Sequence, residues 1–171
     1  MLKIDMIPKL AETLDKFIAN YKPEIVRKVS IGTPKLTEAD LRDIISRSPD
    51  LSWNKDGMYY IMNVNYDIAN IGSELLPDKK FIIQTGKFYY PPGGFMGWHT
   101  NSGTEGYRVY ATYCKEGEKS FFRYFLDGKI HTEWEQKGWN CRMFEVRKDS
   151  LYWHCVWSDT DRYSFGFRYA F

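Results

Sequence analysis

The chain has 171 residues, of which 18% are aromatic and 27% are charged, and its formal net charge at pH 7 is +2. This length allows one domain with a sizeable core and is short for two. Basic and acidic residues are interspersed, so charge gives no sign of nucleic-acid binding, and no segment resembles a membrane span or a signal peptide. The three cysteines are widely spaced without a CxxC pair, which argues against a disulfide framework and favours a reducing, cytoplasmic setting.

Two helices are predicted before residue 50. Residues 8–21 have a proline in the first turn and apolar side chains spaced along one face. Residues 37–47 begin with Thr37, which forms an Asp-containing variant of the capping box with Asp40, and they end before Pro49. Each helix therefore has an apolar face that needs a partner.

Short aromatic-rich segments separated by turns follow the two helices. Asp56-Gly57 is a predicted turn into a strand at 58–62, and a short helix around 68–75 is compatible with the spacing of its apolar residues. Further strands are predicted at 81–90, 107–114, 119–125, 129–134, 140–146, 151–157 and 162–169. Asp127-Gly128 is the clearest hairpin turn.

Seven or eight short strands, spaced about ten residues apart with little helix between them, predict a mainly β domain of the α+β class with a sandwich or jelly-roll core. The N-terminal helices are expected to pack on one outer face. Residues 1–171 are predicted to form a single domain, with residues 1–78 as a helical support region and residues 79–171 as the jelly-roll core.

Two of the three histidines lie in aromatic segments of the C-terminal half, His99 after Trp98 and His154 after Trp153. Histidine is the commonest protein ligand of transition metals, and non-haem iron(II) sites often combine two histidines with one carboxylate. In a jelly roll the first ligand comes from an early strand or loop and the second from a late strand, so the order fits. Position 101, where a carboxylate is expected, is Asn101.

The segment from Tyr90 to Tyr169 resembles the double-stranded β-helix of iron(II)/2-oxoglutarate-dependent dioxygenases. Their pattern is HxD/E, a distal His, and a downstream Arg that is often part of RxS. His99 and His154 match the histidines, while Arg162 and Ser164 match RxS. The order and spacing of these residues are most similar to those of the aspartyl/asparaginyl β-hydroxylase branch, although the interval from His154 to Arg162 is shorter than usual in that branch. The resemblance implies an iron(II)- and 2-oxoglutarate-dependent oxygenase, specifically a hydroxylase.

The resemblance also implies roles for the other candidate residues. Arg162 would pair with the distal carboxylate of 2-oxoglutarate, with Arg168 as the competing candidate, and Ser164 would add a hydroxyl donor on the same strand face. Arg108 would help bind the cosubstrate or the substrate. In the mammalian member of the branch two histidines alone hold the iron, so Asn101 need not abolish activity. Its role as an amide ligand, a neighbour of the ligands or a loop cap stays open.

Trp98, Tyr110 and Trp153 are expected to form aromatic walls that restrict water. Cys155 should face away from the site, because it alternates with the neighbouring histidine along a strand. The substrate, a peptide side chain, a nucleobase or a small molecule, stays open. So do two other functions: a non-catalytic jelly-roll binding or structural domain, which Asn101 favours, and another cupin-type metal enzyme, which the lack of a His-x-His pair disfavours.

Overall fold

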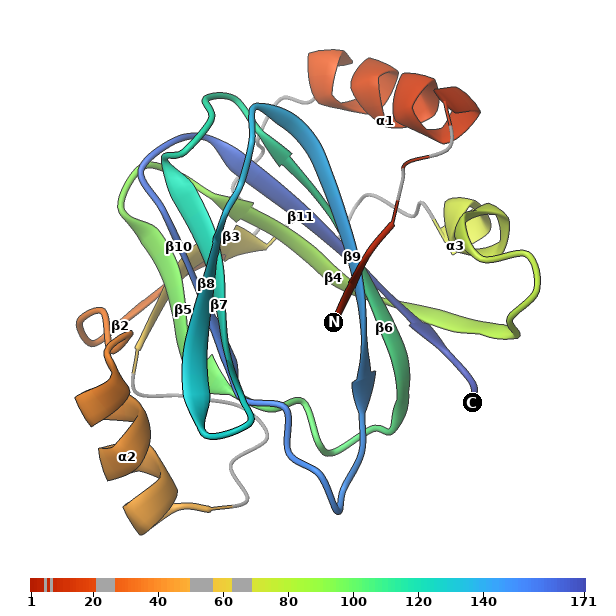
Figure 1. The fold of residues 1–171 in the computed structure, drawn as a ribbon. Helices are drawn as coiled ribbons and strands as arrows, with labels where there is room; N and C mark the ends of the chain where they lie inside the picture. The colour runs from red at the N-terminus through yellow and green to blue at the C-terminus, as the bar shows by residue number, and fades with distance from the viewer. Residues whose placement is uncertain (5, 7, 21–26, 50–56, 63–68) are drawn as a thin grey trace.

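The computed structural model describes residues 1–4, 6, 8–20, 27–49, 57–62 and 69–171. In these residues the chain forms three helices and an eleven-stranded antiparallel sheet that curls into a barrel (Figure 1). Asp56 of the predicted turn and Ile68 of the predicted third helix lie outside the described residues. None of the helices in the described part of the chain has the length and apolar character needed to cross a lipid bilayer.

Eight consecutive strands from Phe81 onward build the barrel. They are β4 (Phe81–Tyr90), β5 (Gly94–His99), β6 (Gly106–Cys114), β7 (Ser120–Leu126), β8 (Lys129–Trp134), β9 (Gly138–Val146), β10 (His154–Ser158) and β11 (Arg162–Tyr169). One layer has the order β9-β6-β11-β4 and the other the order β5-β10-β7-β8. Early and late strands alternate in both layers, which is the arrangement of a jelly roll. The predicted mainly β, jelly-roll class is confirmed.

Three short strands add to this barrel. β1 (Leu2–Lys3) pairs with β9, and β2 (Arg27–Ile31) pairs with β3 (Met58–Met62). β3 also pairs with β4 and β5, so it joins the two layers along one edge. The sequence predicted β3 but not β1 or β2. β1 is too short to show a period, and β2 buries only Val29, so neither has a readable alternation.

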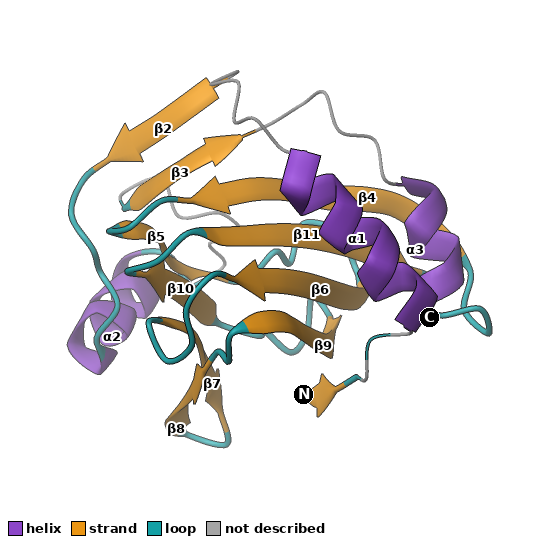
Figure 2. Ribbon diagram, turned by 90° about the horizontal axis from the view of Figure 1, so that it is seen from above, coloured by secondary structure: helices purple, strands orange, loops and turns teal. Residues whose placement is uncertain are grey.

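The helices cover the outside of both layers. α1 (Pro8–Asn20) and α3 (Ala69–Leu75) lie on the layer that contains β6 and β11, where they bury four aliphatic side chains: Leu10, Leu14, Ile71 and Leu75. α2 (Glu38–Arg47) covers the other layer, beside β5 and β10 (Figure 2). The prediction that the N-terminal helices share one outer face is therefore wrong: α1 and α2 lie on different layers. The reason is that β5 and β10 also carry apolar side chains on their outer side, which α2 covers.

The capping box predicted for α2 is confirmed. The Thr37 hydroxyl accepts a hydrogen bond from the Asp40 backbone N–H, and the Asp40 carboxylate accepts one from the Thr37 backbone N–H. The box satisfies two backbone donors at the helix start, which fixes where α2 begins. Leu41 and Ile44 then face the sheet and bury the apolar side of the helix.

The sequence does not predict β5. Gly94–His99 is nevertheless a strand, and its six residues are all buried. β5 lies between β3 and β10 in the sheet. α2 covers one of its faces and the barrel interior the other, so its side chains do not alternate between apolar and polar. A short apolar run of this kind cannot be assigned by periodicity alone.

Candidate functional site

The two predicted histidine ligands lie side by side inside the barrel. His99 ends β5, His154 begins β10, and the two are cross-strand partners in the antiparallel pair. Their ring centroids are 4.2 Å apart and both side chains are buried. Cross-strand partners project from the same face of a sheet, so both imidazoles point inward, where they line a cavity of about 230 Å³.

Each imidazole is oriented by a backbone carbonyl. His99 Nδ1 lies 2.8 Å from the Gly97 oxygen, and His154 Nδ1 lies 2.9 Å from the Tyr152 oxygen. Because a carbonyl only accepts hydrogen bonds, Nδ1 carries the proton in both rings and Nε2 carries the lone pair. Burial lowers the pKa of His99 to about 4, and burial together with the neighbouring His99 lowers the pKa of His154. Both rings are therefore neutral near pH 7, the form that binds metal ions.

Asn101 lies next to this pair. Its backbone has a φ of 58°, in the left-handed region that asparagine tolerates better than most residues. Its Nδ2 donates to the Tyr110 hydroxyl at 3.0 Å and lies 3.2 Å from His154 Nε2. The amide thus faces the lone pair of one imidazole. Within the described residues, no group of three or more His, Cys, Asp or Glu side chains is placed to hold a metal ion.

The predicted cosubstrate residues line the same cavity. Arg108 on β6 and both Arg162 and Ser164 on β11 contribute to its wall. Arg108 is 2% exposed and Arg162 is 1% exposed, so both cations are held inside the protein. The competing candidate, Arg168, is instead the cross-strand partner of Arg108 and is partly buried. The six residues that the sequence singled out for metal and cosubstrate therefore converge on one cavity.

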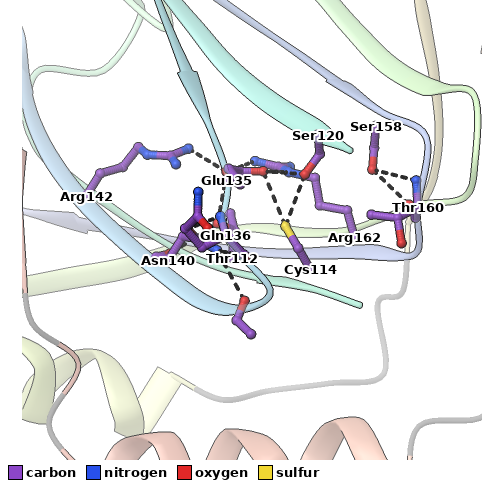
Figure 3. A network of polar contacts seen from close by, with 11 residues as sticks. Thr112, Cys114, Ser120, Glu135, Gln136, Asn140, Arg142, Ser158, Thr160 and Arg162 are labelled. Atoms are coloured by element: carbon purple, nitrogen blue, oxygen red, sulfur yellow. Dashed lines mark hydrogen bonds and ion pairs between the residues drawn. The ribbon is translucent and has the colours of Figure 1, made fainter. Parts of the chain in front are cut away.

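Sequence reasoning missed the buried glutamate at the floor of the barrel. Glu135 directly follows β8, and its carboxylate lies between Arg142 and Arg162 (Figure 3). Arg162 Nε donates to Oε2 at 2.6 Å and Nη2 donates to Oε1 at 2.9 Å, while Arg142 Nη1 lies 2.8 Å from Oε1. The hydroxyls of Thr112 and Ser120 also donate to the carboxylate.

Charge decides the ionisation of this glutamate. Burial alone would raise the pKa of the Glu135 carboxyl, but the charges of Arg162 and Arg142 outweigh burial and hold the pKa far below its usual value. Nothing in the sequence signals this, because β8 is an edge strand whose residues are all exposed or half-buried, and Glu135 directly after it resembles one more surface acid. Only the arginines on two other strands explain its burial.

Glu135 also limits what Arg162 can offer to a ligand. The edge of the guanidinium formed by Nε and Nη2 is occupied, so the predicted two-pronged contact with a cosubstrate is already used within the protein. Nη1 of Arg162 and Nη1 of Arg108 are buried and have no hydrogen-bond partner in the described part of the chain. Among the described residues Arg108, Arg142 and Arg162 are buried beside the buried carboxylate of Glu135. One oxygen of a second carboxylate, Glu133 Oε2, is also buried, so the buried arginines outnumber these acids by one.

The aromatic walls differ from the prediction. Tyr110 lines the cavity as expected, whereas Trp98 and Trp153 pack under α2 on the outer side of the sheet, where Trp98 Nε1 donates to the Thr37 carbonyl at 2.9 Å. The reason is strand alternation: each tryptophan precedes an inward histidine and so must point outward. Cys155 lies in the same outer cluster, which confirms that it faces away from the site.

Other aromatic rings surround the histidines instead. The Phe122 ring stacks on His154 with centroids 5.3 Å apart, and Phe144 meets His154 edge-on at 5.2 Å. Both phenylalanines belong to the cluster of buried residues inside the barrel. They keep the His154 ring in a water-poor environment, the role that the sequence had given to the tryptophans.

No protein-family profile matches the sequence, and no curated protein sequence matches it. Several solved structures resemble the fold. A Pseudomonas putida prolyl-4-hydroxylase is 16% identical, with coverage of 95% of this chain and 100% of that chain and a TM-score of 0.42. The Drosophila melanogaster CENP-C cupin domain is 9% identical, with 96% and 100% coverage and a TM-score of 0.38.

A predicted oxalate decarboxylase from Thermotoga maritima is 17% identical, with 66% and 79% coverage and a TM-score of 0.32. At such identities and TM-scores, these likenesses carry no information about activity. The assignment of the jelly roll therefore rests on the strand order of the chain itself.

Proposed function

We propose that the protein is an iron(II)- and 2-oxoglutarate-dependent oxygenase that hydroxylates its substrate, with His99 and His154 as the metal ligands. The observation that carries the proposal is the cross-strand histidine pair, because both rings present an Nε2 lone pair at the wall of one cavity. Neutral imidazoles oriented by carbonyls suit iron(II). When bound, iron(II) and 2-oxoglutarate would supply, together with dioxygen, the chemistry that converts a substrate C–H into C–OH; one oxygen atom of dioxygen enters the product and the other enters succinate, with release of carbon dioxide.

Arg162 and Ser164 are proposed to hold the distal carboxylate of 2-oxoglutarate. Arg162 Nη1 is buried without a hydrogen-bond partner in the described part of the chain, and the Ser164 hydroxyl follows two residues along the same strand face. An unpaired buried donor is costly, and a carboxylate that accepts from it removes this cost. The two hydrogen bonds to Glu135 fix the plane of the Arg162 guanidinium, so the N–H groups of Nη1 point in a fixed direction.

Calorimetric titration with manganese(II), a stable substitute for iron(II), tests the ligand assignment. The parent protein should bind one ion, and binding should tighten when the 2-oxoglutarate analogue N-oxalylglycine is present. His99→Ala and His154→Ala should each weaken binding by more than about tenfold, since each removes one of two imidazole ligands. His131→Ala is the matched control, because His131 is exposed on β8. Variants that bind manganese as tightly as the parent would contradict the assignment.

A second candidate is a metal-free binding domain. The Asn101 amide lies 3.2 Å from His154 Nε2, so the lone pair proposed for the metal has a hydrogen-bond donor beside it. In this function the arginines would hold an anionic ligand and no reaction would follow. Succinate formation from 2-oxoglutarate with iron(II) and ascorbate separates the two. Manganese binding without succinate formation, in the presence of candidate substrates, would favour another cupin-type metal enzyme.

A further inference from the structure

Two arginines, Arg108 and Arg168, lie side by side at the mouth of the barrel, apart from Arg142 and Arg162, which bind Glu135. Along β6 and β11 the inward residues form cross-strand pairs from floor to mouth: Cys114 with Arg162, Thr112 with Ser164, Tyr110 with Gly166, and Arg108 with Arg168. Partners of this kind share one face of the sheet, so Arg108 and Arg168 project side by side at the last step. Arg168 is six residues from Arg162, roughly 20 Å along an extended strand, so the two ends of the series are distinct sites.

Donors of this pair are left unused inside the protein. Arg108 Nη2 donates to the backbone and hydroxyl oxygens of Thr104. Arg108 Nη1 and Arg168 Nε are both buried and have no hydrogen-bond partner in the described part of the chain. Burial lowers the pKa of Arg108, and the neighbouring charge of Arg168 lowers it further. Two like charges held together with unsatisfied donors are unfavourable unless an anion joins them.

The pair is also reachable from outside. Ile83, the partner of Arg168 on β4, is 52% exposed, so this end of the inner face of the sheet is open to solvent. Arg108 in turn lines the cavity that holds His99 and His154. A ligand that contacts both guanidinium groups would therefore lie where solvent and the histidine cavity meet.

The charge of the loaded site supports an anionic substrate. Iron(II) and the 2-oxoglutarate dianion cancel each other, and Asn101 adds no charge where an acid is usual. Among the described residues the three buried arginines still outnumber the carboxylates of Glu135 and Glu133, so one positive charge is left without compensation. Arg168 adds a further cation at the mouth.

We propose that Arg108 and Arg168 form an oxyanion-binding subsite at the barrel mouth, which holds a carboxylate or phosphate group of the substrate. That the ligand is a substrate rests on the proposed function, whereas binding of an oxyanion does not. Arg108 Nη1 and Arg168 Nε donate to the oxyanion, and a neutral analogue of the substrate would leave both donors unpaired. The subsite thus selects for charge, independently of the deep contact at Arg162.

The test is a titration of the metal-free protein at low ionic strength, in which the NMR signals of the arginine Nε–H groups report binding. Inorganic phosphate and acetate serve as separate probes. We expect the Arg168 Nε–H signal to shift with either probe, and the tighter probe identifies the substrate group. Arg168→Gln should weaken binding at least about tenfold, since it removes a charged donor. Arg147→Gln should leave binding unchanged, because Arg147 is exposed and paired with Glu145.

Two further variants separate this inference from the proposed function. Arg168→Lys keeps the charge and loses the Nε donor, so its affinity should lie between those of the parent and Arg168→Gln. His99→Ala should weaken manganese binding by more than about tenfold while the phosphate-dependent shift persists. An Arg168 signal that does not move with either probe, or an Arg168→Gln variant that melts and binds like the parent, would overturn the subsite even if the metal site is correct.

Discussion

Asn101 is the residue that most separates this cavity from an iron site with two histidines and one carboxylate. It follows His99 by two positions, and its amide lies within 3.2 Å of His154 Nε2. Its backbone φ of 58° is one that aspartate also tolerates, so a carboxylate can replace the amide without rebuilding the loop. The chemistry of this position is therefore open to a direct test.

Asn101→Asp is expected to tighten manganese(II) binding by at least about tenfold, because a carboxylate is a far better ligand for hard divalent ions than an amide. Calorimetric titration of the variant and the parent measures the change. Asn101→Ala is the control and should lose the contact with Tyr110 without gaining affinity. Equal affinities of Asn101→Asp and the parent would show that position 101 does not face the bound ion.

At the level of elements, the start of β6 depends on a glycine. Gly106 has a φ of 133°, and a Cβ at this position would lie 2.3 Å from the Tyr169 backbone oxygen on β11. The close approach brings the ends of β6 and β11 together, and Arg108 and Arg168 project from those ends. Gly106 thus shapes the mouth of the barrel.

Gly106→Ala should lower the free energy of unfolding by at least about 2 kcal/mol, since it combines a disfavoured φ with a steric clash against backbone. Gly93→Ala is the matched control: Gly93 also has a positive φ, of 81°, but a Cβ there would meet nothing within 4 Å. The control should cost about 1 kcal/mol. Urea denaturation of the three proteins gives the comparison, and equal losses in both variants would refute the role of the close approach.

At the scale of the whole molecule, Glu135 joins strands that are far apart in the sequence. Its carboxylate pairs with Arg142 on β9 and Arg162 on β11, and Thr112 on β6 donates to it. Removing the charge leaves two buried arginines without an anion, and breaking a buried ion pair in this way costs about 3–5 kcal/mol. Glu135→Gln should therefore be strongly destabilised, with a lower urea midpoint at pH 7.

The pH dependence provides a separate measurement on the same residue. Because the pKa of Glu135 is depressed in the folded protein, its contribution to stability is present above the unfolded pKa of about 4.3 and is lost as the pH falls below that value. The difference in the free energy of unfolding between the parent and Glu135→Gln should be constant from pH 7 to about pH 5 and should become smaller at lower pH. A difference that does not change with acidification would mean that the folded pKa is not depressed.

Local sequence determined most of the strands and both longer helices. β4, β8 and β11 have the predicted bounds, and the capping box set the start of α2. Each depends on contacts a few residues apart, such as turn residues, caps and the two-residue alternation, which a single sequence contains. β5 is not predictable from the sequence, because a strand buried on both faces has no alternation of apolar and polar residues.

For the candidate site, too, the sequence shows one part and the tertiary structure the other. The sequence alone singles out His99, His154 and Arg162 as candidates, because their residue types and order are visible in one dimension. Their convergence on one cavity, the occupation of Arg162 by Glu135 and the pairing of Arg108 with Arg168 depend on strand register. Register is set by the closing of the whole barrel, so no local pattern could have disclosed which charges meet in its interior.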